Sequence, residues 1–177
     1  MKSIFSLSSE NGEIFALSED LPDNYTGPVL AGSLCYSAQS QHSELVLQEL
    51  RGEEYDIRFI IGKFLRRFYA KGWIHAEGLY GNLMIKGSIQ KERLSFGETQ
   101  LKEGQYCCFY TQPSDWSSFF EKGKELRMLD IFYSPLLLQE LVPYFPDLKS
   151  VIDANPCMLV TKKPFWLSVT IKEIINQ

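Results

Sequence analysis

The fold is decided by the stretch that begins GLYGNLMIKGSIQKERLSF at residues 78–96 and ends at Tyr133. Apolar and polar residues alternate there in short segments, and turn-forming residues such as Gly87, Gly104 and Pro113 separate the segments. Short strands at this regular spacing are typical of an all-β sandwich or barrel. The stretch therefore predicts strands over residues 79–86, 89–96, 105–111 and 126–133, with a short segment at 101–104.

The same alternation extends upstream of Gly78. In residues 55–61, apolar side chains share one face, while Asp56 and Arg58 share the other. A period of two with one polar face predicts a half-buried strand. Further strands are predicted over residues 43–51 and 64–70, with a bulge or turn at Gly62 and a turn at residues 71–73.

The N-terminal segment, residues 1–32, is polar and weakly patterned. Asn11-Gly12 is a strong turn signal that could join two short strands. We expect this segment to be an N-terminal arm that contributes one or two edge strands.

The period changes from two to helical after Tyr133. Ser134 is a good N-cap and Pro135 a good first helical residue, and further helical turns are predicted over residues 147–153. A last helix is predicted to start near Pro164, with an apolar stripe at Leu167, Ile171, Ile174 and Ile175. This pattern stops at Gln177 without a helix-ending residue, which predicts a piece of a longer protein: arm and barrel over residues 1–133, and a helical segment over residues 134–177.

The composition indicates a globular, cytoplasmic protein. Hydrophobic residues make up 45% of the 177 residues, which is enough for a sizeable core in one domain. The sequence contains no secretory signal and no segment apolar enough to span a bilayer, and its four cysteines lack CxxC spacing, so free thiols are expected. The net charge of −4 argues against a chain that by itself binds a phosphate backbone.

Two motifs resemble a known family. Residues 129–148, LDIFYSPLLLQELVPYFPDL, are similar to the strand-to-helix junction in one large subgroup of AraC-family transcription regulators, and Glu103-Gly-Gln-Tyr106 is similar to that subgroup's preceding barrel strand. The resemblance implies a mainly β fold with C-terminal helices (α+β): a cupin-like double-stranded β-helix barrel that binds an effector, followed by an α-helical dimerisation segment. Intact members also carry a C-terminal helix-turn-helix DNA-binding domain, and nothing in this chain matches it.

Two of the predicted strands present candidate effector-binding residues. A ligand cavity needs mostly apolar walls with a few placed polar groups, and alternate residues of a strand share one face. The other faces of these strands include Cys107 and Phe109, while Trp73 and Trp116 are predicted in loops that could cap a barrel mouth. The predicted effector-binding residues are Tyr80, Asn82, Met84, Tyr106, Cys108, Tyr110 and Trp116. The alternative is that these aromatic residues fill the barrel or face outward.

The sequence predicts no metal, cofactor or catalytic site. A metal-binding cupin presents two neighbouring histidines, a glutamate and a later histidine to one ion, whereas this chain has only His42 and His75, far apart. Cys107 and Cys108 lie in a predicted strand, where a cysteine is usually a small buried hydrophobic residue. We therefore do not expect an enzyme; the alternative is a small metal-independent cupin-like enzyme, such as an isomerase or lyase.

The favoured hypothesis is the signal-sensing and dimerisation domain of an AraC-like transcription regulator with a small-molecule effector. The stripe of Leu167, Ile171, Ile174 and Ile175 either packs on the barrel or meets the same helix of a second subunit, and the resemblance favours a homodimer. DNA would be contacted only through a domain absent from this chain, and no membrane partner is expected.

Overall fold

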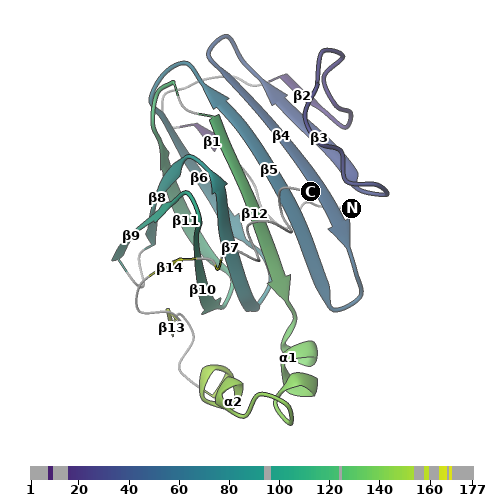
Figure 1. Ribbon diagram of the computed structural model, residues 1–177, viewed down its shortest axis with the longest axis vertical. Helices are drawn as coiled ribbons and strands as arrows, with labels where there is room; N and C mark the ends of the chain where they lie inside the picture. The colour runs from purple at the N-terminus through teal and green to yellow at the C-terminus, as the bar shows by residue number, and fades with distance from the viewer. Residues whose placement is uncertain are drawn as a thin grey trace.

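The computed structural model of this 177-residue chain describes residues 8–9, 16–93, 97–123, 125–153, 158–159, 164–166 and 168. The described strands form two antiparallel sheets (Figure 1). The smaller sheet has the order β1-β6-β11-β8-β9, with the bounds Ser8–Ser9, Phe68–Ile74, Ser114–Phe120, Ser88–Arg93 and Gly97–Lys102. The larger sheet has the order β13-β10-β7-β12-β5-β4-β3-β2, with the bounds Met158–Leu159, Gln105–Thr111, Gly78–Lys86, Glu125–Tyr133, Tyr55–Phe64, Ser43–Arg51, Leu34–Gln39 and Ala16–Ser18.

The main hydrophobic core lies between the two sheets. Phe64 of β5 stacks on Phe68 of β6 with ring centroids 5.2 Å apart, and Phe120 of β11 lies 4.6 Å from Phe64. Met84 of β7 and Leu101 of β9 are completely buried in the same cluster. Because successive strand residues point to opposite faces, the apolar face of each sheet covers that of the other. The prediction of a mainly β protein is thereby confirmed.

Three segments predicted as turns or loops are parts of strands. Gly62 continues β5, because it pairs with Leu45 of β4 on one side and Leu126 of β12 on the other. Trp73 lies in β6 and Trp116 in β11, and these two strands pair along their whole length. The prediction of loops around both tryptophans was wrong because polar residues and a glycine interrupt the apolar alternation in these strands.

The arm contributes edge strands, as predicted. β1 pairs with β6 at the edge of the smaller sheet, and β2 pairs with β3 at the edge of the larger one. The sequence did not predict β3 itself, which pairs along its whole length with residues 44–49 of β4. The predicted turn at Asn11-Gly12 lies outside the described residues.

The first helix begins as predicted. In α1 (Pro135–Leu141), Ser134 is the N-cap, and its Oγ accepts a hydrogen bond of 3.1 Å from the backbone N–H of Leu137. Leu138 is almost completely buried against Leu79 and Tyr110, which joins the helix to the larger sheet. A second helix, α2 (Asp147–Ile152), follows. Neither of these described helices has the length and apolar character needed to cross a membrane.

Leu138 should anchor α1 to the larger sheet. We expect Leu138→Ala to lower the free energy of unfolding by about 3 kcal/mol, because it empties a closed site beneath the helix. Leu136→Ala, in the same helix at a side chain that is 53% exposed, is the matched control and should change it by less than about 0.5 kcal/mol. Urea denaturation of both variants measures this difference, and equal losses would contradict the assignment.

The segment after α2 returns to the larger sheet. β13 and β14 (Phe165–Trp166) both pair with β10, antiparallel to it, and so satisfy backbone groups along its edge. The helix predicted to start near Pro164 therefore does not start there, since the following two residues extend a sheet. The predicted dimer-interface residues Leu167, Ile171, Ile174 and Ile175 lie outside the described residues.

Candidate ligand-binding cavity

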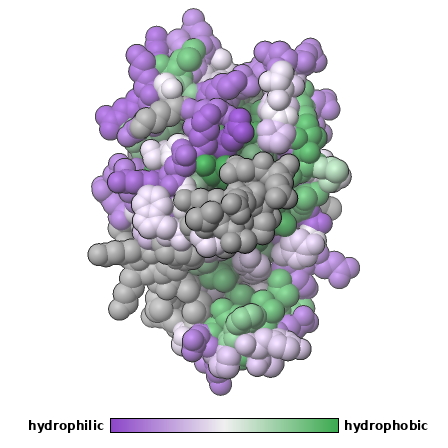
Figure 2. Space-filling view, in the orientation of Figure 1, coloured by the Kyte–Doolittle hydropathy of each residue, from purple (hydrophilic) through white to green (hydrophobic). Residues whose placement is uncertain are grey.

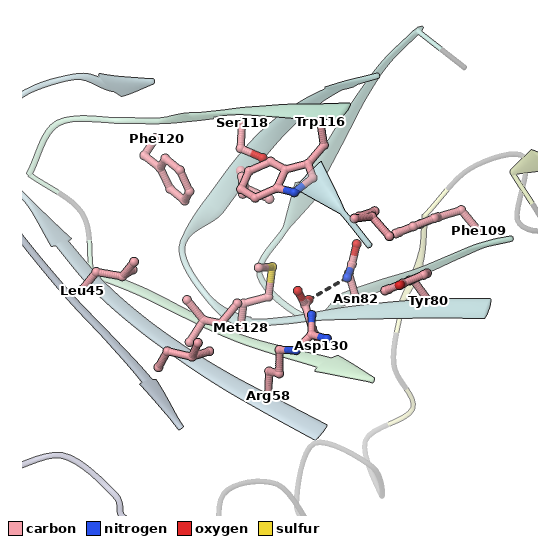
Figure 3. A pocket seen from close by; sticks show the side chains of 14 residues that line it. Leu45, Arg58, Tyr80, Asn82, Phe109, Trp116, Ser118, Phe120, Met128 and Asp130 are labelled. Carbon is pink, nitrogen blue, oxygen red and sulfur yellow. Dashed lines mark hydrogen bonds between the residues drawn. The ribbon is translucent and has the colours of Figure 1, made fainter. Parts of the chain in front are cut away.

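A cavity of about 80 Å³ lies between the two sheets, and strands of both sheets line it (Figure 3). Its apolar lining comes from Leu45, Leu47, Ile60, Ile74, Ile89, Phe109, Phe120 and Met128. Its other lining residues are Arg58, Tyr80, Asn82, Trp116, Ser118 and Asp130. Mostly apolar walls with a few polar groups are typical of small-molecule sites.

One wall belongs to a row of four side chains, Glu49, Arg58, Asp130 and Asn82, which we call the polar row. The four residues lie on adjacent strands, β4, β5, β12 and β7, and each is the register partner of the next. Side chains directly opposite each other in antiparallel strands have Cβ atoms roughly 4.5–5.5 Å apart. The four side chains of the polar row therefore lie side by side on one face of the larger sheet, and Arg58, Asp130 and Asn82 line the cavity.

Hydrogen bonds hold the polar row together. Asn82 Nδ2 donates to Asp130 Oδ1 at 2.6 Å, and Arg58 Nε donates to Glu49 Oε1 at 3.1 Å. Arg51 Nε donates to the other Glu49 oxygen at 2.8 Å, and this bond raises the pKa of Arg51. The Glu49 side chain is completely buried. These two guanidinium groups, and not water, therefore stabilise its carboxylate.

Asp56 places another carboxylate next to Arg58. Asp56 Oδ2 lies 3.9 Å from Arg58 Nη2. Burial raises the pKa of the Asp56 carboxyl above its ordinary value, and the Arg58 guanidinium opposes this rise. Arg58 is only 6% and Asp56 only 9% exposed, so the polar face of the predicted half-buried strand is an inner face of the protein.

The opposite wall comes from β11 of the smaller sheet, where Trp116 and Ser118 lie across the cavity from the polar row (Figure 3). Ser118 is 1% exposed, and its Oγ has no hydrogen-bond partner among the described residues. At one end of the cavity the ring of Tyr80 stacks on that of Phe109, with centroids 5.4 Å apart. The Tyr80 hydroxyl donates to the carbonyl oxygen of Ala76 at 2.9 Å, so its donor is satisfied within the protein.

Three of the seven predicted effector-binding residues, Tyr80, Asn82 and Trp116, line the cavity. Met84 does not line it and is completely buried in the adjoining core with Phe68. The structure thus brings three of these side chains to one space and uses the fourth to fill the core. Contact of any of them with a ligand remains a prediction.

Tyr106, Cys108 and Tyr110 lie on the other face of β10, away from the cavity. Cys107 and Phe109 take the inner positions, and strand alternation sends their neighbours to the outer face. Burial raises the pKa of Cys108 to about 11 and that of Tyr110 to about 12, and burial also raises the pKa of Tyr106. These groups are therefore neutral near neutral pH, and Tyr110 and Cys108 pack in the cluster beneath α1.

The cavity residues Arg58, Asp130 and Ser118 were not predicted from the sequence. Asp130 did leave a signal, because it is the one carboxylate in phase with Leu126 and Met128 on this strand. Arg58 could not be found in the same way, because its pairing with Asp130 joins strands that are far apart in the chain. Ser118 left no such signal, since β11 was predicted as a loop and no face could be assigned to it.

Among the residues that the structure describes, no histidine or cysteine lines this cavity. Within the described ranges, no three His, Cys, Asp or Glu side chains are grouped so that they could hold a metal ion. His75 is exposed, and Cys35, Cys107 and Cys108 are thiols rather than disulfides.

Comparison with known proteins gives distant likenesses. No family model matches the sequence, and no curated protein matches it. Among solved structures, the chain is similar to the AraC-like transcriptional activator CuxR, at 11% identity and a TM-score of 0.46, over 97% of this chain and 57% of that chain. The chain therefore spans little more than half the length of that protein.

Two further solved structures show comparable likeness. A mutant of oxalate decarboxylase from Bacillus subtilis is 15% identical with a TM-score of 0.42, over 64% of this chain and 32% of that one. A cupin domain of an XRE-family transcriptional regulator from Enterobacter cloacae is 13% identical with a TM-score of 0.40, over 51% of this chain and 97% of that one.

Proposed function

We propose that this chain is the signal-sensing and dimerisation domain of an AraC-like transcription regulator, and that a small-molecule effector binds between its sheets. The observation that carries this proposal is the cavity, with the polar row on one wall and the Ser118 hydroxyl on the other. Protein interiors are close-packed, and an empty cavity lowers stability. A ligand that fills this cavity and bonds its buried polar groups would therefore recover the lost stability.

The regulatory part of the proposal rests on residues 129–148. Their resemblance to the strand-to-helix junction of AraC-family regulators is supported by the N-cap at Ser134 and by the burial of Leu138. We propose residues 1–133 as the arm and a cupin-like barrel, and residues 134–177 as the dimerisation segment. DNA would be bound by a domain outside this chain, in the cytoplasm.

An exposed apolar surface supports the proposed dimerisation. Leu136 of α1 is 53% exposed and Phe145, between α1 and α2, is 59% exposed. Hydrophobic residues gather at the end of the molecule where these helices lie (Figure 2). Contiguous apolar surface of this kind marks interaction sites. We propose that this surface takes part in the dimer contact, and we keep Leu167, Ile171, Ile174 and Ile175 as the dimer-interface residues proposed from the sequence.

The alternative function is that of a small metal-independent cupin-like enzyme, such as an isomerase or lyase. The polar row favours this alternative, because a carboxylate can accept a proton from a substrate and a neighbouring guanidinium can stabilise the negative charge that then develops. The two functions differ in the fate of the bound molecule. A sensor releases its ligand unchanged, whereas an enzyme converts it, and mass spectrometry of the ligand after incubation separates them.

The ligand proposal is tested by a thermal-shift screen of small molecules. A ligand at a hundred times its Kd stabilises a folded protein by about 2.7 kcal/mol, which corresponds to a rise in Tm of about 5 to 10 °C for a chain of this size. We expect hits to lose this shift in Ile60→Phe, which puts a ring into the cavity. Light scattering of the same samples should give twice the mass of the chain.

The matched control is Ile57→Phe, on the same strand but away from the cavity. It should keep the ligand-induced shift, since residues 57 and 60 are three positions apart on β5 and therefore face opposite sides of the sheet. Hits that shift Tm equally in both variants bind elsewhere. The proposed function is overturned if no molecule in the screen raises Tm in a way that Ile60→Phe abolishes.

A further inference from the structure

The groups around the polar row carry an excess of negative charge. The three carboxylates of Glu49, Asp56 and Asp130 lie among the two guanidiniums of Arg51 and Arg58, so their formal charges sum to −1. Arg58, the cation in the cavity wall, is already opposed by Glu49 at 3.1 Å and Asp56 at 3.9 Å. A negatively charged ligand would add to this excess in a poorly solvated space, which is unfavourable.

Asp130 is the acceptor that this wall presents to a ligand. One of its oxygens accepts a hydrogen bond from Asn82, and its side chain lines the cavity. An ionised carboxylate has about four acceptor positions and no donor. A ligand group that donates a hydrogen bond, whether hydroxyl or ammonium, is therefore complementary to it.

Ser118 presents a second polar group from the facing wall. Its hydroxyl is buried and has no partner among the described residues, and a buried polar group without a partner lowers stability. A hydroxyl both donates and accepts, so it can bond the polar group of a ligand that lies between the sheets. The aromatic rings of Tyr80, Phe109 and Trp116 line the same space and favour an apolar or cationic body.

We propose that the cavity binds a small molecule with a short apolar body and a hydrogen-bond-donating group but no negative charge, that is, a small alcohol or protonated amine held between Asp130 and Ser118. This inference rests on the proposed function, because it gives the chemistry of the same effector site. The cavity of about 80 Å³ is smaller than the cavity of about 150 Å³ that holds benzene. The ligand body is therefore limited to a few carbon atoms.

Three probes of one size separate the charges: n-propylamine, n-propanol and propionate. Each is titrated into the full chain at neutral pH and constant ionic strength, and binding is followed by NMR chemical shifts. We expect Kd values on the order of millimolar for the amine and the alcohol, at least about tenfold lower than that for propionate. The proposal is overturned if propionate binds as tightly, or if neither amine nor alcohol binds at roughly 0.1 M.

Ser118→Ala and Ser117→Ala form a matched pair of neighbours on β11, of which only Ser118 lines the cavity. Ser118→Ala should weaken n-propanol binding about fivefold to tenfold. It should leave the Tm of the ligand-free protein unchanged or higher, because it removes an unsatisfied hydroxyl. Ser117→Ala should leave the affinity unchanged. A lower Tm with unchanged affinity would show that the Ser118 hydroxyl is structural and would contradict its role in binding.

The Ile60→Phe variant separates a wrong ligand class from the absence of a ligand site. If propionate or a larger anion binds and Ile60→Phe abolishes that binding, the cavity is still a ligand site and only the ligand class is wrong. If no molecule binds in a way that Ile60→Phe abolishes, both proposals are overturned.

Discussion

Glu49→Ala is expected to lower the free energy of unfolding by about 3 to 5 kcal/mol. The Glu49 carboxylate is completely buried and accepts hydrogen bonds from Arg58 at 3.1 Å and from Arg51 at 2.8 Å. Without it, a guanidinium that is almost fully buried is opposed mainly by Asp56 at 3.9 Å. Such a charge destabilises the folded protein because water cannot reach it. Urea denaturation with linear extrapolation measures the loss.

The control is a double variant in which neither charge remains, Glu49→Leu with Arg58→Met. Replacing a buried ion pair by apolar residues of similar size is often neutral or stabilising, so this variant should be more stable than Glu49→Ala. Arg51→Ala removes a partner that is 20% exposed and should have a smaller effect than Glu49→Ala. A typical single hydrogen bond contributes about 1 kcal/mol. A loss below this value for Glu49→Ala would show that Glu49 does not stabilise the buried charge of Arg58.

Phe68→Ala is the second substitution with a large expected effect, a loss of about 3 to 5 kcal/mol. Phe68 is 2% exposed and packs against the rings of both Phe64 and Phe120, with centroids 5.2 and 5.8 Å away. Alanine would remove ring contacts to residues of both sheets and leave a cavity that β5, β6 and β11 cannot close. The free energy of unfolding, from the same denaturation experiment, measures this loss.

Phe119→Ala is the control for Phe68→Ala, because it removes the same ring from the outer face of β11. Phe119 is only partly buried, and its ring lies 3.9 Å from the guanidinium carbon of Arg67. A contact of this kind at an exposed site contributes about 0.5 to 1 kcal/mol, so the loss should be several times smaller than for Phe68→Ala. Similar losses for the two variants would mean that the core does not lie between the sheets.

Local patterns in the sequence predicted much of the fold. Glycine turns and alternating residues located most of β7, β8, β10 and β12, and the Ser134-Pro135 pair located the start of α1. These elements were predictable because turn chemistry, capping and alternation act between residues close together in the chain. β11 and the second half of β6, predicted as a loop and a turn, were not, because their partly polar sequences become strands by pairing with neighbouring strands.

The site was less predictable than the fold because it depends on pairing between strands far apart in the chain. β12 lies between β5 and β7, and only this order sets Asp130 between Arg58 and Asn82. Alternation correctly separated Phe109 from Tyr110 on β10, but it cannot tell which of two apolar faces is the inner one. That choice depends on the smaller sheet on one side and on α1 on the other.

The two faces of β10 also have an evolutionary consequence. Phe109 lines the cavity, while Tyr110, the next residue, packs beneath α1. Because neighbours in a strand point in opposite directions, a mutation at one position alters one surface and leaves the other largely intact. The residues that determine ligand specificity can therefore change during evolution while the residues that contact α1 stay the same. New specificities can arise in this way without loss of the fold.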